Sequence, residues 1–281
     1  MWKRHFKCFR KPQKKGEIML SAKIDKMKQM HLLAVLLVPI VVLLVLGAAV
    51  SKSWALPLAE AKIYFEYNST DQDLGIHIFT DGEAWNELEV TGPDGTIFVA
   101  NNDNQLSEIG STEFFTESAE PGLAEGCEGE CNDDDIEAAI LAFQEKFRAG
   151  KYEFFATPIE GADLKGRGTL SHSLPAPPEI SSPGEEDGSL NPEEPIISWS
   201  PGEGGATVVR WEVVVEFEKR GTEETYKVTY ELPAAATSVT VAKEFFDSLS
   251  GFQGEYKAEV LGIAANRNAT ITEHEFELGD E

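Results

Sequence analysis

The chain has 281 residues, and its formal net charge of −25 is divided unevenly along the sequence. Residues 1–31 contain ten of the 24 Lys and Arg residues but two of the 49 acidic residues, which leaves 14 basic and 47 acidic residues in positions 32–281. A surface this acidic repels nucleic acid and anionic lipid, so neither is expected as its partner. The hydrophobic fraction of 42% suffices for packed cores, and the residues beyond position 60 fit two small domains better than one.

An uninterrupted apolar stretch, Leu32–Val50, follows the basic lead. As a helix it would span ~28 Å, close to the ~30 Å hydrocarbon core of a bilayer. Because Lys and Arg remain on the cytoplasmic side, the N-terminus is predicted to stay inside and everything after Val50 to be exported. The stretch is either a transmembrane helix or the core of a signal peptide, since small residues around Ala55 and Ala61 match cleavage sites. The protein is therefore expected to be single-pass in the cytoplasmic membrane, or secreted after cleavage near Ala55 or Ala61.

Two of the three cysteines lie in the exported part. Cys127 and Cys131 are four positions apart, and in an oxidising compartment they are expected to form a disulfide that closes a small loop. A metal pair is the alternative, but neither a His nor a second Cys pair stands nearby to complete four ligands.

Residues 60–173 are predicted to form a small β-rich domain with one helix. Ile63, Phe65 and Tyr67 alternate with polar positions, which is the period of a strand. From Asp133 the apolar period becomes helical, and a helix is predicted over 133–149, with an acidic start and with Lys146 and Arg148 in its last turn. The other expected strands are Ile76–Thr80, a hairpin of Leu88–Val90 and Thr96–Val99 around a Pro-Asp-Gly turn, and a closing hairpin of Tyr152–Ala156 and Leu164–Leu170.

A second β-rich region follows a segment rich in Pro, Gly and Glu. Residues 174–195 are predicted to be a linker that runs into a first edge strand, and residues 196–281 the rest of a β-sandwich. About seven strands fall within roughly a hundred residues, which is typical of an immunoglobulin-like sandwich. The longest alternation assigns five side chains to one buried face: Val209, Trp211, Val213, Val215 and Phe217.

The order of these features resembles a fibronectin type III domain over about residues 175–279. The resemblance rests on the Pro-rich entry, Trp199 on the second strand, the LPAAATSVTV segment and the run from Tyr256 to Asn266. It implies that Trp199 packs in the core, as the strand pattern itself predicts for Trp211, and that Tyr256 makes a tyrosine corner. The two-part layout is also similar to that of exported bacterial proteins, which implies a location and no activity.

The exported part offers little for catalysis. His77, His172 and His274 are its three histidines, and none stands in a recognisable nucleophile and base arrangement, so the chain is predicted not to be an enzyme. His77 lies in the middle of a strand and is interpreted as a sheet histidine with satisfied hydrogen bonds. Among the acidic turns, Asp71 and Asp73 are the best candidates for a calcium ion. No other cofactor or metal is expected.

Two functional hypotheses follow. The first is an exported, non-enzymatic interaction or spacer module on the outer side of the cytoplasmic membrane, which binds a protein or glycan through loops or strand edges. The alternative is a carbohydrate-binding or calcium-dependent accessory module of an envelope enzyme, with Asp71, Asp73 or an exposed Trp85 at the contact. The fold itself does not decide between them.

Overall fold

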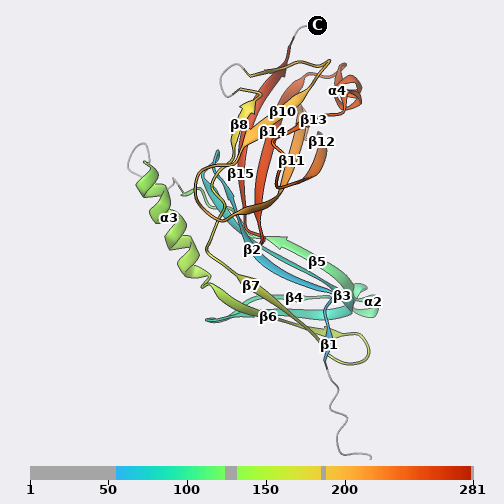
Figure 1. The fold of residues 1–281 in the computed structure, drawn as a ribbon. Coiled ribbons are helices and arrows are strands. Elements are labelled where there is room, and N and C mark those ends of the chain that lie inside the picture. The colour runs from blue at the N-terminus through green and yellow to red at the C-terminus, as the bar shows by residue number, and fades with distance from the viewer. Residues whose placement is uncertain (1–54, 124–131, 185–187, 280–281) are drawn as a thin grey trace, which may run out of the picture. The chain divides into compact units, whose positions relative to one another are not determined.

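The structure is a computed structural model that describes residues 55–123, 132–184 and 188–279 (Figure 1). The predicted membrane segment 32–50, Cys127 and Cys131 lie outside these ranges. Within the ranges, no helix combines the length and the apolar character that a membrane crossing needs. Residues 54–281 form one compact unit, which holds separate hydrophobic cores for its first and second β-rich regions.

The first region is organised around one long strand, β3. Its first half pairs with β2 and β5, and its second half with β4 and β6, all antiparallel. β7 continues the sheet from β6, and β1 pairs with β7 in parallel. In chain order the elements are β1 (Leu56–Pro57), β2 (Glu60–Asn68), β3 (Asp73–Gly92), β4 (Gly95–Asn101), α2 (Leu106–Ile109), β5 (Ser111–Glu117), α3 (Asp133–Lys146), β6 (Gly150–Pro158) and β7 (Leu164–Leu170).

The β3 strand corrects the sequence prediction, which divided it into Ile76–Thr80 and Leu88–Val90. The intervening residues, for which no strand was predicted, continue the strand with register shifts against β5 and β6. Trp85 lies within this stretch and is buried in the core. Gly82 allows the close approach of Leu58, since a Cβ there would come within 2.7 Å of the Leu58 side chain. β5 was not predicted at all.

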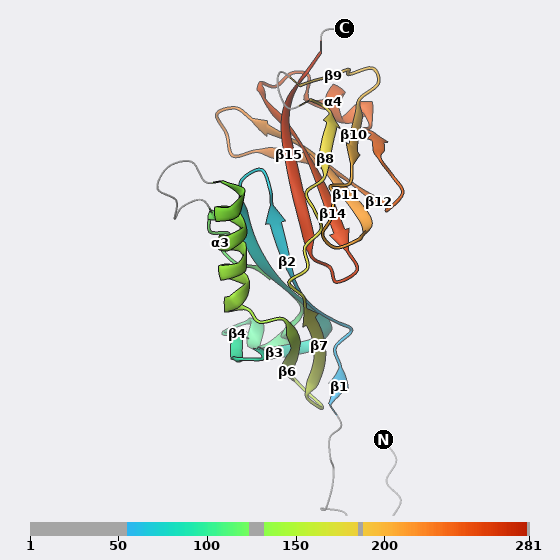
Figure 2. The same cartoon turned by 60° about the vertical axis from the view of Figure 1, so that its left-hand side comes forward.

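Helix α3 begins at a capping box and ends earlier than predicted. The Asn132 side chain accepts hydrogen bonds from the backbone N–H groups of Asp134 and Asp135, and the Asp135 carboxylate accepts from the Asn132 N–H. The helix ends at Lys146, so Arg148 lies outside it and pairs with Asp94 instead. Figure 2 shows the helix alongside β2, where the rings of Phe143 and Phe147 pack against Phe65.

The second region is a fibronectin type III-like sandwich. A three-stranded sheet with the order β13-β10-β8 faces the strands β12-β11-β14-β15 of the larger sheet (Figure 1). Trp199 and Trp211 lie in the core between them and contact each other edge to face. The elements are β8 (Glu179–Ser182), β9 (Ser189–Leu190), β10 (Ile196–Ser200), β11 (Val208–Lys219), β12 (Thr225–Pro233), β13 (Ser238–Thr240), α4 (Lys243–Leu249), β14 (Gly254–Ala264) and β15 (Ala269–Leu278).

Two details of the sandwich differ from the expectations. A register shift against β14 between Val208 and Arg210 leaves Val209 47% exposed, so it does not share the buried face of Trp211. Tyr256 stacks on Phe276, but its hydroxyl makes no hydrogen bond with a described residue, so the tyrosine corner is not formed there. Helix α4 lies just before β14, in the connection where that corner was expected.

Candidate functional site

Four ionisable side chains converge on the face of the first sheet that is turned away from its core. Glu66 comes from β2, His77 from β3, Glu117 from the end of β5 and Glu120 from the segment after it. The register explains the meeting, because Glu117 lies directly opposite His77, and Glu66 lies opposite Gly75. Their potential ligand atoms all lie within 4.8 Å of one another. We call these four residues the Glu/His cluster.

His77 is the buried centre of the Glu/His cluster, with 4% of its surface exposed. Its Nε2 lies 3.1 Å from Oε1 of Glu117 and 3.9 Å from Oε1 of Glu66, yet it makes no hydrogen bond with a described residue. Nε2 therefore lacks the hydrogen bond expected of a satisfied sheet histidine, although the Glu117 carboxylate lies within ion-pair distance. Burial lowers the pKa of His77 and outweighs the opposite effect of Glu117, so a neutral ring is favoured. The rings of Tyr64 and Phe115 pack on either side.

The carboxylates of the cluster are held close together at an energetic cost. Burial, together with the negative charges of Glu117 and Glu212, raises the pKa of Glu66 to about 7. Glu120 is exposed as a residue, but its carboxyl group folds over Gly75, where an added Cβ would lie 3.0 Å from its Oε1. Local burial and a hydrogen bond with Glu117 hold the pKa of Glu120 well above its usual range.

The Glu/His cluster borders a larger polar pocket of about 450 Å³. Strands β2, β3 and β5 line one part of it, with Glu66 and His77 among their residues. Strands β11, β12, β14 and β15 and the loop between β14 and β15 supply the rest from the outer face of the sandwich. Lys257 lies on the same face and pairs with Glu259 at 3.0 Å and with Glu273 at 3.1 Å. The charged residues that the outer face of the sandwich contributes to the pocket lining are Arg210, Glu212, Lys227, Glu259 and, from the β14–β15 loop, Arg267.

The residues that the sequence selected lie elsewhere or have other roles. Asp71 accepts a hydrogen bond from Asn68 Nδ2 at 3.2 Å, and Asp73 has a buried Oδ1 without a hydrogen bond to a described residue. Neither belongs to the Glu/His cluster, although the charge of Asp73 raises the pKa of Glu66 and Glu120. Trp85 is 1% exposed, so it cannot form the exposed aromatic platform of the carbohydrate hypothesis.

The sequence analysis missed Glu66, Glu117 and Glu120. The alternation of β2 places Glu66 on the face opposite Phe65, so its position on the outer face of the sheet could have been predicted from the sequence. The positions of Glu117 and Glu120 depend on the pairing of β5 with β3, which the period of the sequence does not reveal. The cluster therefore emerges only from the register of three strands.

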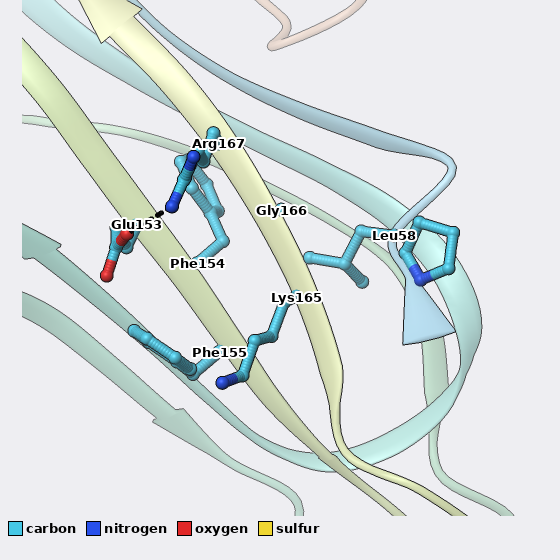
Figure 3. Close-up of a pocket in the computed structure, with 8 residues that line it drawn as sticks. Leu58, Glu153, Phe154, Phe155, Lys165, Gly166 and Arg167 are labelled. Carbon is cyan, nitrogen blue, oxygen red and sulfur yellow. Dashed lines mark hydrogen bonds and ion pairs between the residues drawn. The ribbon is translucent and has the colours of Figure 1, made fainter. Parts of the chain in front are cut away.

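A second pocket, of about 420 Å³, lies between β1, β6 and β7. Figure 3 shows Lys165 above the ring of Phe155, with 4.9 Å between Nζ and the ring centre, and Arg167 paired with Glu153 at 3.1 Å. Both partners of the ion pair are well exposed, so it contributes little to stability. This pocket has no converging ligand atoms among its lining residues and suggests no chemistry.

The comparisons with known proteins concern the fold alone. No family model and no curated protein matches the chain. Among solved structures it is similar to fibronectin(III)-like modules of Clostridium thermocellum CbhA, with 9% identity, 79% of this chain and 92% of that chain covered, and a TM-score of 0.27. The FN1-FN3 domains of chicken CNTN1 match at 8% identity, with 79% of this chain and 65% of that chain covered, and a TM-score of 0.30.

A structure of a 1.5-MDa bacterial ice-binding adhesin matches at 14% identity over 81% of this chain and 66% of that chain, with a TM-score of 0.23. Scores this low do not establish a common overall arrangement. The description of the second region as fibronectin type III-like therefore rests on its own strand order, with three strands facing four across a core that contains Trp199.

Proposed function

We propose that the chain is an exported, non-enzymatic protein whose two β-rich regions act together as an interaction or spacer unit on the outer side of the cytoplasmic membrane. The observation that carries the proposal is the parallel pairing of β15 with β2, which makes one continuous sheet of strands from both regions. A spacer needs such a join, because separate domains on a flexible linker would not hold a binding surface at a fixed position.

Buried hydrogen bonds support this join. The Asn268 side chain is fully buried, accepts from the Phe65 N–H at 3.0 Å, and donates to the carbonyl groups of Ser171 at 2.8 Å and Ser173 at 3.0 Å. Thr270 donates to the Pro175 carbonyl at 2.8 Å. These contacts join β15 to β2 and to the segment that connects the regions. The first residues of the predicted linker are thus part of the packed unit.

The sequence pattern of residues 1–50 supports the location, and the packing of the first described residues bears on the position of any cleavage. Leu58 is buried in the first core, and Leu56 pairs with Leu164. Cleavage after Ala61 would remove both residues, whereas cleavage after Ala55 would leave the fold complete. If the apolar stretch is a signal peptide, this packing favours a mature chain that begins at Leu56.

Fractionation of cells that express the full chain tests the proposed location, with intact mass to identify the first residue. We expect an intact membrane-bound chain, or a released chain that begins near Leu56, and in either case digestion by protease added to spheroplasts. Leu43→Arg places a charge in the apolar stretch and should reduce export. Leu141→Arg, at an exposed position of α3 far along the chain from the apolar stretch, is the matched control and should be exported normally. A wild-type chain in the cytosol, protected from added protease, would contradict the proposal.

A further inference from the structure

We propose that the Glu/His cluster of Glu66, His77, Glu117 and Glu120 binds one divalent first-row transition metal ion of the Zn²⁺ or Mn²⁺ class. The inference is independent of the proposed export and spacer function. It concerns residues other than Asp71 and Asp73, and a different class of ion from calcium.

The buried imidazole distinguishes this cluster from an ordinary group of surface carboxylates. Nε2 of His77 is buried, lacks a hydrogen bond with any described residue and lies among the carboxylates of Glu66 and Glu117. A buried polar atom without a hydrogen bond is rare in folded proteins, and a bound ion is one explanation for it. A neutral imidazole can donate the Nε2 lone pair to a metal.

The donor set selects the class of metal. One imidazole nitrogen and three carboxylates suit Zn²⁺, Mn²⁺ or Fe²⁺, whereas Ca²⁺ prefers six to eight oxygen ligands and seldom takes nitrogen. Ligand atoms of a tetrahedral zinc site lie about 3.4 Å apart. The potential ligand atoms of the Glu/His cluster lie within 4.8 Å of one another, so they need to move only a small distance closer to form such a site. Glu117 and Glu120 can make this movement, because both are exposed.

The surroundings also favour a cation at this point. The carboxylates of Glu66, Glu117 and Glu120 lie close enough to repel one another, and among the described residues neither Glu66 nor Glu120 forms an ion pair with a Lys or Arg. A divalent ion would relieve this repulsion. It would also tie β2, β3 and the segment after β5 together, so bound metal is expected to stabilise the first region against unfolding.

Metal titration of the full chain in detergent, after removal of metal with a chelator, tests the proposal. We expect one Zn²⁺ or Mn²⁺ per chain, with Ca²⁺ at the same concentration much weaker. The unfolding midpoint should rise by roughly 5 to 10 °C when the metal exceeds its dissociation constant about a hundredfold. His77→Gln should weaken binding by more than about tenfold, because loss of even an outer-sphere partner costs that much.

Matched variants separate this site from other acidic and thiol groups. Glu117→Gln should weaken binding, whereas Glu113→Gln, on the same strand but exposed and outside the cluster, should not. His274→Gln and the double variant Cys127→Ser/Cys131→Ser should bind as the wild type does. If His77→Gln fails to fold, Glu117→Gln provides the test of the metal site in its place. The proposal is overturned if the wild type binds no stoichiometric metal, or if binding survives both His77→Gln and Glu117→Gln.

Discussion

At the scale of single residues, Asn268 makes the most specific buried contact between the two β-rich regions. Asn268→Ala would leave the Phe65 N–H and the Ser171 carbonyl group without their side-chain partner, whereas the Ser173 carbonyl would keep its hydrogen bond from Asn266. We expect a loss of about 2 to 4 kcal/mol in the free energy of unfolding, since each unsatisfied buried group costs about 1 to 3 kcal/mol. Urea unfolding followed by tryptophan fluorescence measures this loss. Asn191→Ala removes an exposed amide and should cost less than about 1 kcal/mol; equal effects would contradict the role given to Asn268.

Lys257 separates two carboxylates that face each other across a strand pair. Glu259 lies opposite Glu273, and Lys257 Nζ pairs with both. Lys257→Met should cost about 1 to 2 kcal/mol, because like charges directly opposite are unfavourable. Lys227→Met, on the exposed strand β12, is the control and should change stability little.

The pH dependence of the Lys257→Met effect follows from the direction of its pKa shift. Burial alone would lower the pKa of Lys257, but the hydrogen bonds and charges of Glu259 and Glu273 outweigh burial and raise it. A base whose pKa is higher in the folded state than in the unfolded state stabilises the folded state fully at pH values below its unfolded pKa, about 10.4. This stabilisation decreases as the pH rises above that value. The difference between wild type and variant should therefore be constant from about pH 6 to 9 and shrink above about pH 10.4. A difference that disappears near pH 8 would contradict this account.

At the scale of elements, the start of α3 depends on the Asn132 capping box. Asn132→Ala removes the acceptor for the N–H groups of Asp134 and Asp135 and should cost about 0.5 to 2 kcal/mol. Asn132→Gly should cost only a few tenths, because glycine suits the cap position without a side-chain acceptor. Hydrogen exchange of the first helical turn should accelerate in the alanine variant. Equal exchange in the two variants would show that the cap does not determine the stability of this end.

The strands show which features a sequence can predict. Strand β11 was predictable because Trp211, Val213 and Val215 alternate over a face that is buried throughout. The continuity of β3 was not, because bulges carry it through polar residues and Gly82. The same limit applies to the candidate site. Glu66 lies on a predictable face of β2, but its meeting with His77 and Glu117 depends on cross-strand register, which distant parts of the chain determine together.

At the scale of the whole described unit, two separate cores share one sheet through the pairing of β2 with β15. If this join is as firm as its buried hydrogen bonds indicate, damage to one core must weaken protection from hydrogen exchange in both regions. Val213 is fully buried in the second core. Val213→Ala should cost about 2 kcal/mol from lost burial and a small cavity.

Hydrogen exchange measured by mass spectrometry under mildly destabilising conditions reports the protection of backbone amides in each of the two cores separately. We expect the slowest amides of β2 and β3 to lose protection in Val213→Ala to the same extent as those of β11 and β14, because cooperative opening exposes all of them together. Val209→Ala lies on the same strand, but its side chain is largely exposed, so protection should remain close to that of the wild type. Loss confined to residues 196–278 would mean that the sandwich opens alone, and the two regions would then be independent modules rather than one spacer unit.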